Sequence, residues 1–303
     1  MSGLEPLAIA GQAAKAVVKA EQGDPQDREA LRELAKESGA LDPAARAYAK
    51  RLAVKEQIRM KIWQPLGMLF GISRDYFEND FADDLADRVA QIPEEELITP
   101  RLSVAGPTVQ GIAFTVDEPE LRAMYLNLLA AASDSRVAST AHPAFAEIIR
   151  QLSPEEAVIL GPVLNQAYHP IIEIRSKVVN AEGGPDRGWN TLSTLVMNWT
   201  LNGQQAFVPE RALQIVNWQR LGLVTVAFDT FMTADGAYEW AETNPRVIGL
   251  RTALDTDDLK RIQIEKGLLT VTDFGRAFNQ VVIRPGRAAQ QNQSPTAADD
   301  SSA

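Results

Sequence analysis

Apolar residues recur at helical spacing through the middle of the chain, in two stripes separated by a polar break at residues 133–140. Recurrence at i, i+3, i+4 and i+7 is typical of a helix that buries one face. We therefore predict two helices packed face to face. Their expected inward side chains are Leu121, Met124, Tyr125, Leu128 and Leu129, followed by Phe145, Ile148, Ile149 and Leu152.

A third helix is predicted to begin at Ser153, where the order Ser-Pro-Glu-Glu matches a helix N-terminus. Ser153 can cap the helix, and Pro154 fits the first turn, where its missing N–H costs nothing. Glu156 can reach back to close a capping box. The side chains expected to point inward from this helix are Val158, Ile159, Val163 and Leu164.

Earlier segments also follow helical patterns, at residues 4–20, 28–37 and 43–64. An acidic amphipathic helix is expected to end before Pro93, with Phe77, Phe81, Leu85 and Val89 on its apolar face. The apolar segment Trp63–Ile72 is open to two interpretations, a buried helix corner or a helix on a membrane surface. Its short length, two glycines and one proline favour the corner, because interfacial helices carry a longer basic face.

The pattern changes after Gly161. Residues 162–175 are predicted to continue as a helix with a break at Pro170, and the glycine-rich segment 178–189 marks a domain boundary. A helix with apolar residues from Ala212 to Trp218 should stop at Gly222, because glycine favours helix C-termini. A strand at 267–272 and a helix capped by Thr272 follow, an order similar to that of a winged-helix domain.

We therefore expect a mainly α protein, with a helical bundle core and a C-terminal winged-helix-like α/β domain. The predicted parts are a helical N-terminal region at 1–92, a helical core at 93–180, the winged-helix-like domain at 181–286 and a tail at 287–303. The tail is polar and poor in apolar residues, a composition typical of disorder.

Composition narrows the class of protein. The 303 residues are 45% apolar and 23% charged, which suits one or two globular cores. The absence of cysteine excludes disulfides, cysteine-bound metals and a thiol nucleophile. No stretch approaches the roughly 20 apolar residues of a membrane span, and the first residues do not resemble a secretion signal. We predict a cytoplasmic protein without an integral membrane segment.

No familiar catalytic pattern occurs in the sequence. The phosphate-binding loop, the dinucleotide-binding glycine fingerprint, the zinc-protease helix and the serine-hydrolase elbow are all missing. The two histidines, His142 and His169, each precede a proline and have no nearby third partner for metal or acid–base work. The acidic run Asp255–Asp258 lacks the glycine and glutamate of a calcium loop. We therefore expect no enzyme activity, cofactor or metal.

A partner surface is predicted on the helix before Gly222 and on the segments after it. Its polar and basic side chains are Arg211, Asn217, Gln219, Arg220, Lys266 and Arg276. In a winged-helix domain these residues would face DNA. Nearby carboxylates make the region almost neutral, and the net charge of the chain is −10, so we favour a protein partner over DNA.

The central helices also carry a family resemblance. A helix ending in NLLAAA, followed by HPAFAEIIRQLSPEEAVIL, resembles the central block of the abortive-infection alpha (Abi-alpha) family, most clearly over residues 93–165. That family comprises bacterial proteins associated with phage defence and has no established reaction, so the resemblance implies a biological context but no catalytic residue. The matching residues, with structural or partner-binding roles, are His142, Pro143, Phe145, Leu152, Ser153, Pro154 and Glu155.

The resemblance implies a non-enzymatic interaction protein of antiviral defence that binds a protein partner or itself. Two alternatives stay open from the sequence. A winged-helix transcriptional regulator would bind DNA through Arg211 and Arg220, and a defence effector would perturb membranes through the segment Trp63–Ile72.

Overall fold

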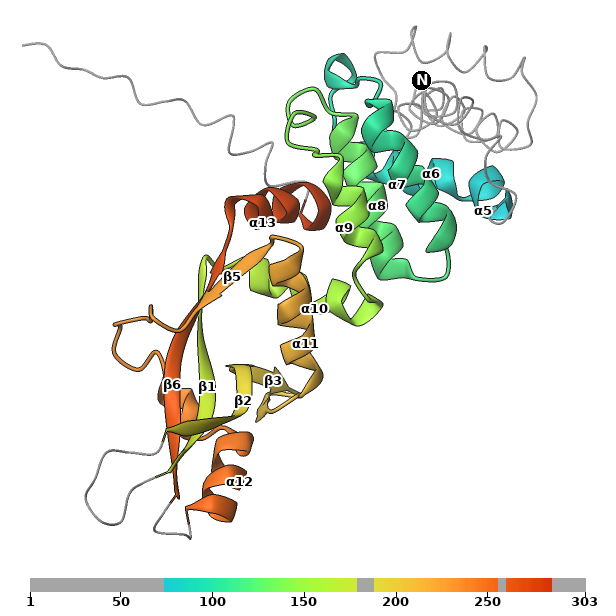
Figure 1. Cartoon of the computed structure of the whole chain (residues 1–303). Coiled ribbons are helices and arrows are strands. Elements are labelled where there is room, and N and C mark those ends of the chain that lie inside the picture. The colour runs from blue at the N-terminus through green and yellow to red at the C-terminus, as the bar shows by residue number, and fades with distance from the viewer. Residues whose placement is uncertain (1–73, 179–187, 256–259, 285–303) are drawn as a thin grey trace, which may run out of the picture.

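The computed structural model describes residues 74–178, 188–255 and 260–284 (Figure 1). Helices gather at one end of these residues and a curled sheet lies at the other, with α10, α11 and α13 where the two meet. The helices expected before residue 65, the segment Trp63–Ile72 and the expected tail lie outside the described residues.

The helical end is built around the apolar stripes that the sequence predicts. Its elements are α5 (Arg74–Asn79), α6 (Phe81–Val89), η2 (Glu94–Glu96), α7 (Leu102–Phe114), α8 (Pro119–Ala132) and α9 (Ala144–Arg150). The expected inward residues of α8 and α9 are all buried, which confirms both stripes. The expected residues of α5 and α6 are also buried, namely Phe77, Phe81, Leu85 and Val89.

Helix α10 (Pro154–Leu164) begins where the sequence predicts, and its capping box is present. Val163 and Leu164 are buried as expected. The expectation for Val158 is wrong, because its side chain is 60% exposed and Leu160 is fully buried instead. The helix is apolar on several sides, so its pattern alone does not show which side meets the core.

Beyond α10 the chain forms a four-stranded antiparallel sheet in the order β2-β1-β6-β5. Its strands are β1 (Tyr168–Val178), β2 (Trp189–Met197), β5 (Val224–Ala227) and β6 (Lys260–Val271). The longest pairing joins β1 to β6 without interruption, from Tyr168 opposite Thr270 to Val178 opposite Lys260. The segments predicted as core and as winged-helix-like domain therefore share one sheet.

The expected fold class, mainly α with a winged-helix-like domain, is wrong, because the protein is a mixed α/β structure. The main error lies at residues 162–175, where the predicted helix ends at Leu164 and strand β1 follows. Ile171 and Ile172 are adjacent and both fully buried, so the start of β1 is apolar on both faces, and the alternation of a half-buried strand is confined to the few residues after Ile172. Pro170 precedes the first β1–β2 pair, a position that tolerates proline.

The two faces of the sheet pack against different layers. Ile171 joins the core of the helical end, so one continuous apolar core extends from the helices onto this face. Helix α11 (Glu210–Arg220) covers part of the same face, where it contacts β2 and β5. Ile172 and Ile174 face the other way, toward a second core that includes Val247 of α12 (Pro245–Leu254).

Two short elements complete the α11 side and the α12 side of the sheet. The hairpin of β3 (Trp199–Leu201) and β4 (Gln204–Ala206) precedes α11. Asn202 and Gly203 turn it with φ of 52° and 76°, the left-handed conformation that two-residue hairpin turns require. The 3-10 turn η3 (Glu239–Ala241) precedes α12, and Gln205 of β4 donates to the Trp240 carbonyl at 2.8 Å.

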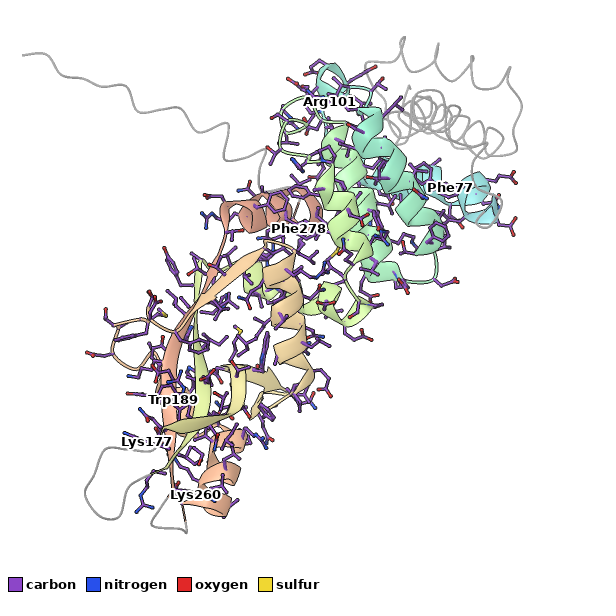
Figure 2. The ribbon with its side chains drawn as sticks, viewed as in Figure 1. Phe77, Arg101, Lys177, Trp189, Lys260 and Phe278 are labelled. Atoms are coloured by element: carbon purple, nitrogen blue, oxygen red, sulfur yellow. The ribbon has the colours of Figure 1, made fainter. Side chains whose placement is uncertain are left out.

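The chain returns to the helical end through α13 (Asp273–Phe278) and the π-helical turn η4 (Asn279–Ile283). Thr272 caps α13 by accepting from the Gly275 N–H at 2.9 Å, which confirms the predicted cap. Thr272 also donates to the Gly222 carbonyl at 2.7 Å, so α13 lies directly against the turn after α11. Figure 2 shows Phe278 at this junction, far from Lys177, Trp189 and Lys260 at the other end of the sheet.

The approach of α13 to the α11 turn depends on Gly275. A Cβ added there would lie 2.2 Å from the Leu223 carbonyl oxygen, well inside contact distance. We expect Gly275→Ala to lower the free energy of unfolding by about 1–3 kcal/mol, measured by urea denaturation.

Gly249 in α12 provides the matched control, because a Cβ added there meets nothing within 4 Å. Gly249→Ala should leave stability unchanged or raise it by about 0.5–1 kcal/mol, since alanine is the better helix former. Equal effects of the two substitutions would show that α13 does not approach Leu223 so closely.

Candidate functional site at the junction of α9, α10 and α11

The first half of the family-like motif packs against the C-terminal helix. Phe145 is fully buried, with its ring 5.1 Å from that of Phe274 and 5.4 Å from that of Phe278 between centroids. The ring of His142 lies edge-on to Phe274 at 5.7 Å, and its Nδ1 accepts from the Ala144 N–H at 3.1 Å. His142 thus orients the start of α9, and Phe145 anchors α9 on α13.

The second half of the motif builds the N-terminus of α10. The Ser153 hydroxyl accepts from the Glu156 N–H at 3.2 Å, and the Glu156 carboxylate accepts from the Ser153 N–H at 2.9 Å. This confirms the predicted capping box. Glu156 is only 6% exposed, and its other oxygen accepts from the Asn217 side chain at 2.9 Å. A buried carboxylate needs such donors, so the cap also holds α11.

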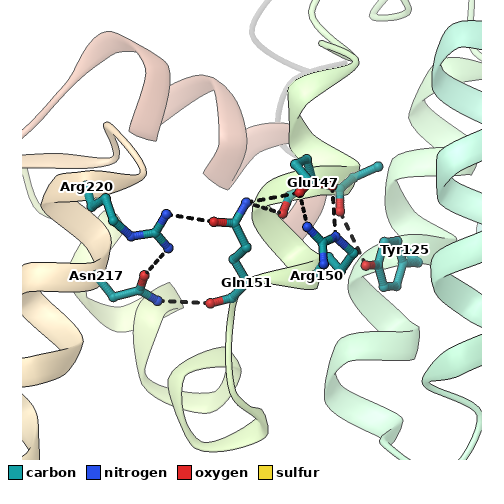
Figure 3. Close-up of polar contacts among 7 residues, drawn as sticks. Tyr125, Glu147, Arg150, Gln151, Asn217 and Arg220 are labelled. Atoms are coloured by element: carbon teal, nitrogen blue, oxygen red, sulfur yellow. Dashed lines mark hydrogen bonds and ion pairs between the residues drawn. The ribbon is translucent and has the colours of Figure 1, made fainter.

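Two residues of the predicted partner surface, Asn217 and Arg220, meet the motif at this point (Figure 3). The Asn217 amide donates to the Gln151 carbonyl at 3.0 Å as well as to Glu156. Arg220 donates to the Gln151 side chain at 2.7 Å and to the Asn217 side chain at 2.7 Å. The C-terminal half of α11 is therefore bonded to the turn between α9 and α10.

The network extends from Gln151 along α9 (Figure 3). The Gln151 amide donates to the Glu147 carbonyl at 3.1 Å, and Arg150 donates to the Glu147 carboxylate at 2.9 Å. The Arg150 guanidinium lowers the pKa of Glu147 below its ordinary value. At the α8 side, the Tyr125 hydroxyl donates to the Ala146 carbonyl at 3.3 Å, and burial raises the pKa of Tyr125.

The other predicted surface residues lie on separate elements and have their own neighbours. Arg211, at the start of α11, stacks over the Trp199 ring at 5.3 Å. Lys266 of β6 lies over the Tyr238 ring at 5.2 Å. Arg276 of α13 pairs with Asp273 and donates to the Val271 carbonyl at 2.7 Å. Gln219 is half-buried. The structure thus brings together Asn217 and Arg220 with the motif, rather than all six residues.

Sequence reasoning missed the residues that connect the motif to α11. Gln151 links α9 to α11 but shows no distinguishing pattern in the sequence. Glu156 was identified only as a cap, and its bond to Asn217 spans 61 positions along the chain. The capping-box pattern identifies Glu156 from the sequence, whereas no pattern of neighbouring residues identifies Asn217 as its second partner.

The histidines occupy different environments. His142 is exposed, while His169 of β1 is part-buried and its Nε2 donates to the Val163 carbonyl at 2.8 Å. Burial lowers the pKa of His169 below its ordinary value. Among the described residues, no group of three or more His, Asp or Glu side chains could hold a metal ion.

Comparison with known proteins completes the description of the site. The fold and the junction define a mixed α/β protein in which the motif residues join a set of helices to a curled sheet. The family model described as abortive infection alpha matches residues 73–282, and the chain belongs to that family. No curated protein and no solved structure matches the chain. Within the described ranges, no helix has the length and apolarity needed to cross a bilayer.

Because Glu156 both closes the capping box with Ser153 and accepts from Asn217, its removal should lower the stability of the protein. Glu156→Ala removes the return bond to Ser153 and one acceptor of Asn217, and should lower the free energy of unfolding by about 1–2 kcal/mol. Glu155→Ala is the matched control, because Glu155 is the exposed neighbour in the same turn and should change stability less. Thermal melts of both variants test this, and equal losses would contradict the assigned bond.

The environment of His169 predicts a pH effect on stability. Its folded-state pKa is lowered, so the unfolded chain binds a proton more readily. The stabilisation is complete above the unfolded pKa of about 6.5 and is lost as pH falls through the folded pKa. His169→Gln keeps an N–H donor for Val163 without titrating.

The urea midpoint of the unaltered protein should fall between pH 7.5 and pH 5, and the midpoint of His169→Gln should fall less. The difference between the two decreases should correspond to roughly one titrating group. Identical pH dependence of the variant and the unaltered protein would remove His169 as the source.

Proposed function

We propose that this protein acts in abortive-infection defence as a non-enzymatic interaction protein, through contact with a partner protein. Membership of the abortive infection alpha family supports the biological context. The observation that carries the mechanism is on α11, where Leu213 is 73% exposed and Val216 is 49% exposed.

The arrangement of α11 suits a docking surface. Ile215 and Trp218 on its inner side are fully buried, and Asn217 and Arg220 bond to the turn before α10. Buried apolar contacts and these hydrogen bonds therefore fix α11 in place around the exposed residues Leu213 and Val216. Leu213 and Val216 are three residues apart and lie on the same side of the helix. A rigid display of this kind lowers the entropy lost on binding.

The chemistry of the surface indicates the kind of partner. Arg220 lies one turn beyond Val216 and is exposed, so a cation borders the apolar pair. A complementary partner offers an apolar cluster with a carboxylate at its edge. Binding then combines burial of the two apolar side chains with a charged contact at the rim.

This surface supports a protein partner more than DNA. Asn217, which a recognition helix would direct to bases, donates to Gln151 and Glu156 of the same chain. Leu213 and Val216, the outward residues, offer no hydrogen bonds to base edges or phosphates. The membrane alternative rests on the segment Trp63–Ile72, which lies outside the described residues.

The test is protection from phage in cells that express the protein. The double variant Leu213→Ser, Val216→Ser should lower protection about tenfold or more, because truncation of interface anchors typically weakens binding by that factor. Its melting temperature should change little, since both side chains are exposed. Light scattering of the purified protein separates a partner from a second copy of the chain.

Leu102→Ser supplies the control, because Leu102 is 70% exposed on α7, outside the proposed surface. Full protection by the double variant, at normal protein levels, would refute the docking role of α11. Equal loss in the control and the double variant would indicate a general effect of surface substitution.

A further inference from the structure

A small cavity lies at the end of the helical part that is far from the sheet, between the start of α7 and the end of α8. Its volume is about 210 Å³, which is below the roughly 300–1,000 Å³ of sites for drug-sized ligands, so it suits one small chemical group. Figure 2 shows Arg101, one of its lining residues, at this end of the helices. The other residues that line it are Ile98, Val104, Ala132, Ser135, Ala138 and Ser139.

Backbone hydrogen bonds join the segment before α7 to the turn after α8, and these two segments form walls of the cavity. The Ile98 N–H donates to the Ser133 carbonyl at 2.9 Å, and the Ser135 N–H donates to the Glu96 carbonyl at 2.9 Å. A short antiparallel bridge results at this point. The walls are therefore fixed before a ligand enters, and such a preformed site lowers the entropy lost on binding.

Arg101 provides a cation at the cavity. No described residue forms a hydrogen bond or an ion pair with its guanidinium. The carboxylates of the two paired segments have other partners, because Asp134 accepts from Arg136 at 2.6 Å and Glu96 accepts from the Ser135 hydroxyl. An unpaired guanidinium beside a cavity favours an anion that it can bind through two parallel hydrogen bonds.

The rest of the lining combines an apolar wall with a few polar donors. Val104 and Ala132 are buried and Ala138 is half-buried, so this wall carries no charge. No side chain caps the N-terminus of α7, so the N–H groups of its first turn are available to an anion, and Ser139 adds a hydroxyl to the lining. A single cation suits the single charge of a carboxylate better than the larger charge of a phosphate. A ligand that satisfies both parts is a carboxylate attached to a compact apolar group.

We propose that the cavity binds a small carboxylate with an apolar side group, its charge on Arg101 and its apolar group against Val104, Ala132 and Ala138. Two sources present this chemistry, a free small acid and the C-terminal residue of a peptide. The cavity shares no residue with the proposed docking surface on α11. It is therefore a separate site of the protein.

The probe is N-acetyl-leucine, titrated into the full chain and followed by chemical shifts and saturation-transfer NMR at low salt. N-acetyl-leucinamide is the matched control, because it has the same apolar group without the charge. Acetate is the second control, with the charge but without the apolar group. We expect N-acetyl-leucine to bind about tenfold more tightly than either control, since each control lacks one half of the recognition.

Substitutions in the lining locate the site. Arg101→Gln should weaken the binding of N-acetyl-leucine about tenfold or more. Arg101→Lys should retain part of the affinity, because lysine keeps the charge but loses the paired hydrogen bonds. Ala138→Leu should block binding by filling the cavity. Arg284→Gln, which removes an exposed arginine outside the lining, should bind as the unaltered protein does.

A tetrapeptide that ends in leucine distinguishes the two sources. Binding at least as tight as that of N-acetyl-leucine, and lost when the C-terminus of the peptide is amidated, assigns the site to C-terminal residues of peptides. Weaker binding of the peptide assigns the site to free small acids.

Absence of N-acetyl-leucine binding at millimolar concentration overturns the proposal. Equal binding of N-acetyl-leucinamide, or binding that Arg101→Gln leaves unchanged, also overturns it. Thermal melts of the Arg101 and Ala138 variants identify any loss that arises from unfolding. Because the phage-protection test uses variants of α11, failure here leaves that test unaffected.

Discussion

The contact of Phe145 with Phe274 and Phe278 determines how the sheet is positioned against the helices. Phe145 belongs to α9, whereas the other two rings belong to α13, which directly follows the strand β6. Because β6 lies between β1 and β5, its end fixes the position of the whole sheet. The aromatic rings supply a large buried area with defined geometry, so the contact is strong and specific.

A polar junction complements this aromatic one. Glu156 is a buried carboxylate that accepts from the Ser153 backbone and from the Asn217 side chain. Two apolar surfaces can shift against each other at little cost in free energy. A buried carboxylate that loses its hydrogen-bond donors, in contrast, strongly destabilises the folded state. The bond of Asn217 to Glu156 therefore fixes where α11 meets the N-terminus of α10. As a result, α11 keeps a defined outer side on which Leu213 and Val216 are exposed.

The residues by which the family is recognised stabilise this junction. Phe145 and Leu152 are buried, Ser153 caps α10, and His142 orients the start of α9. The exposed side chains that we propose to meet a partner protein, Leu213 and Val216, lie elsewhere, on the outer side of α11. The motif residues therefore build the framework of this chain, while the proposed docking surface uses residues outside the motif.

Local chemistry is enough to place several elements from the sequence. The cap at Ser153, the cap at Thr272 and the apolar stripes of α8 and α9 involve residues only a few positions apart, and all are found in the structure. The chain's family is also visible in a short segment, because the motif residues are close in sequence. These signals require no knowledge of distant partners.

Long-range pairing decides the rest. Ile171 and Ile172 are adjacent and both buried, so the segment 168–178 lacks a clear strand pattern at its start and is compatible with a helix until β6, some ninety positions later, supplies the hydrogen bonds of a strand. The exposure of Leu213 and the meeting of Asn217 with Glu156 likewise depend on where α10 packs. A pattern of apolar residues shows that a segment is buried, but the partner that buries it determines its conformation and which side chains remain at the surface.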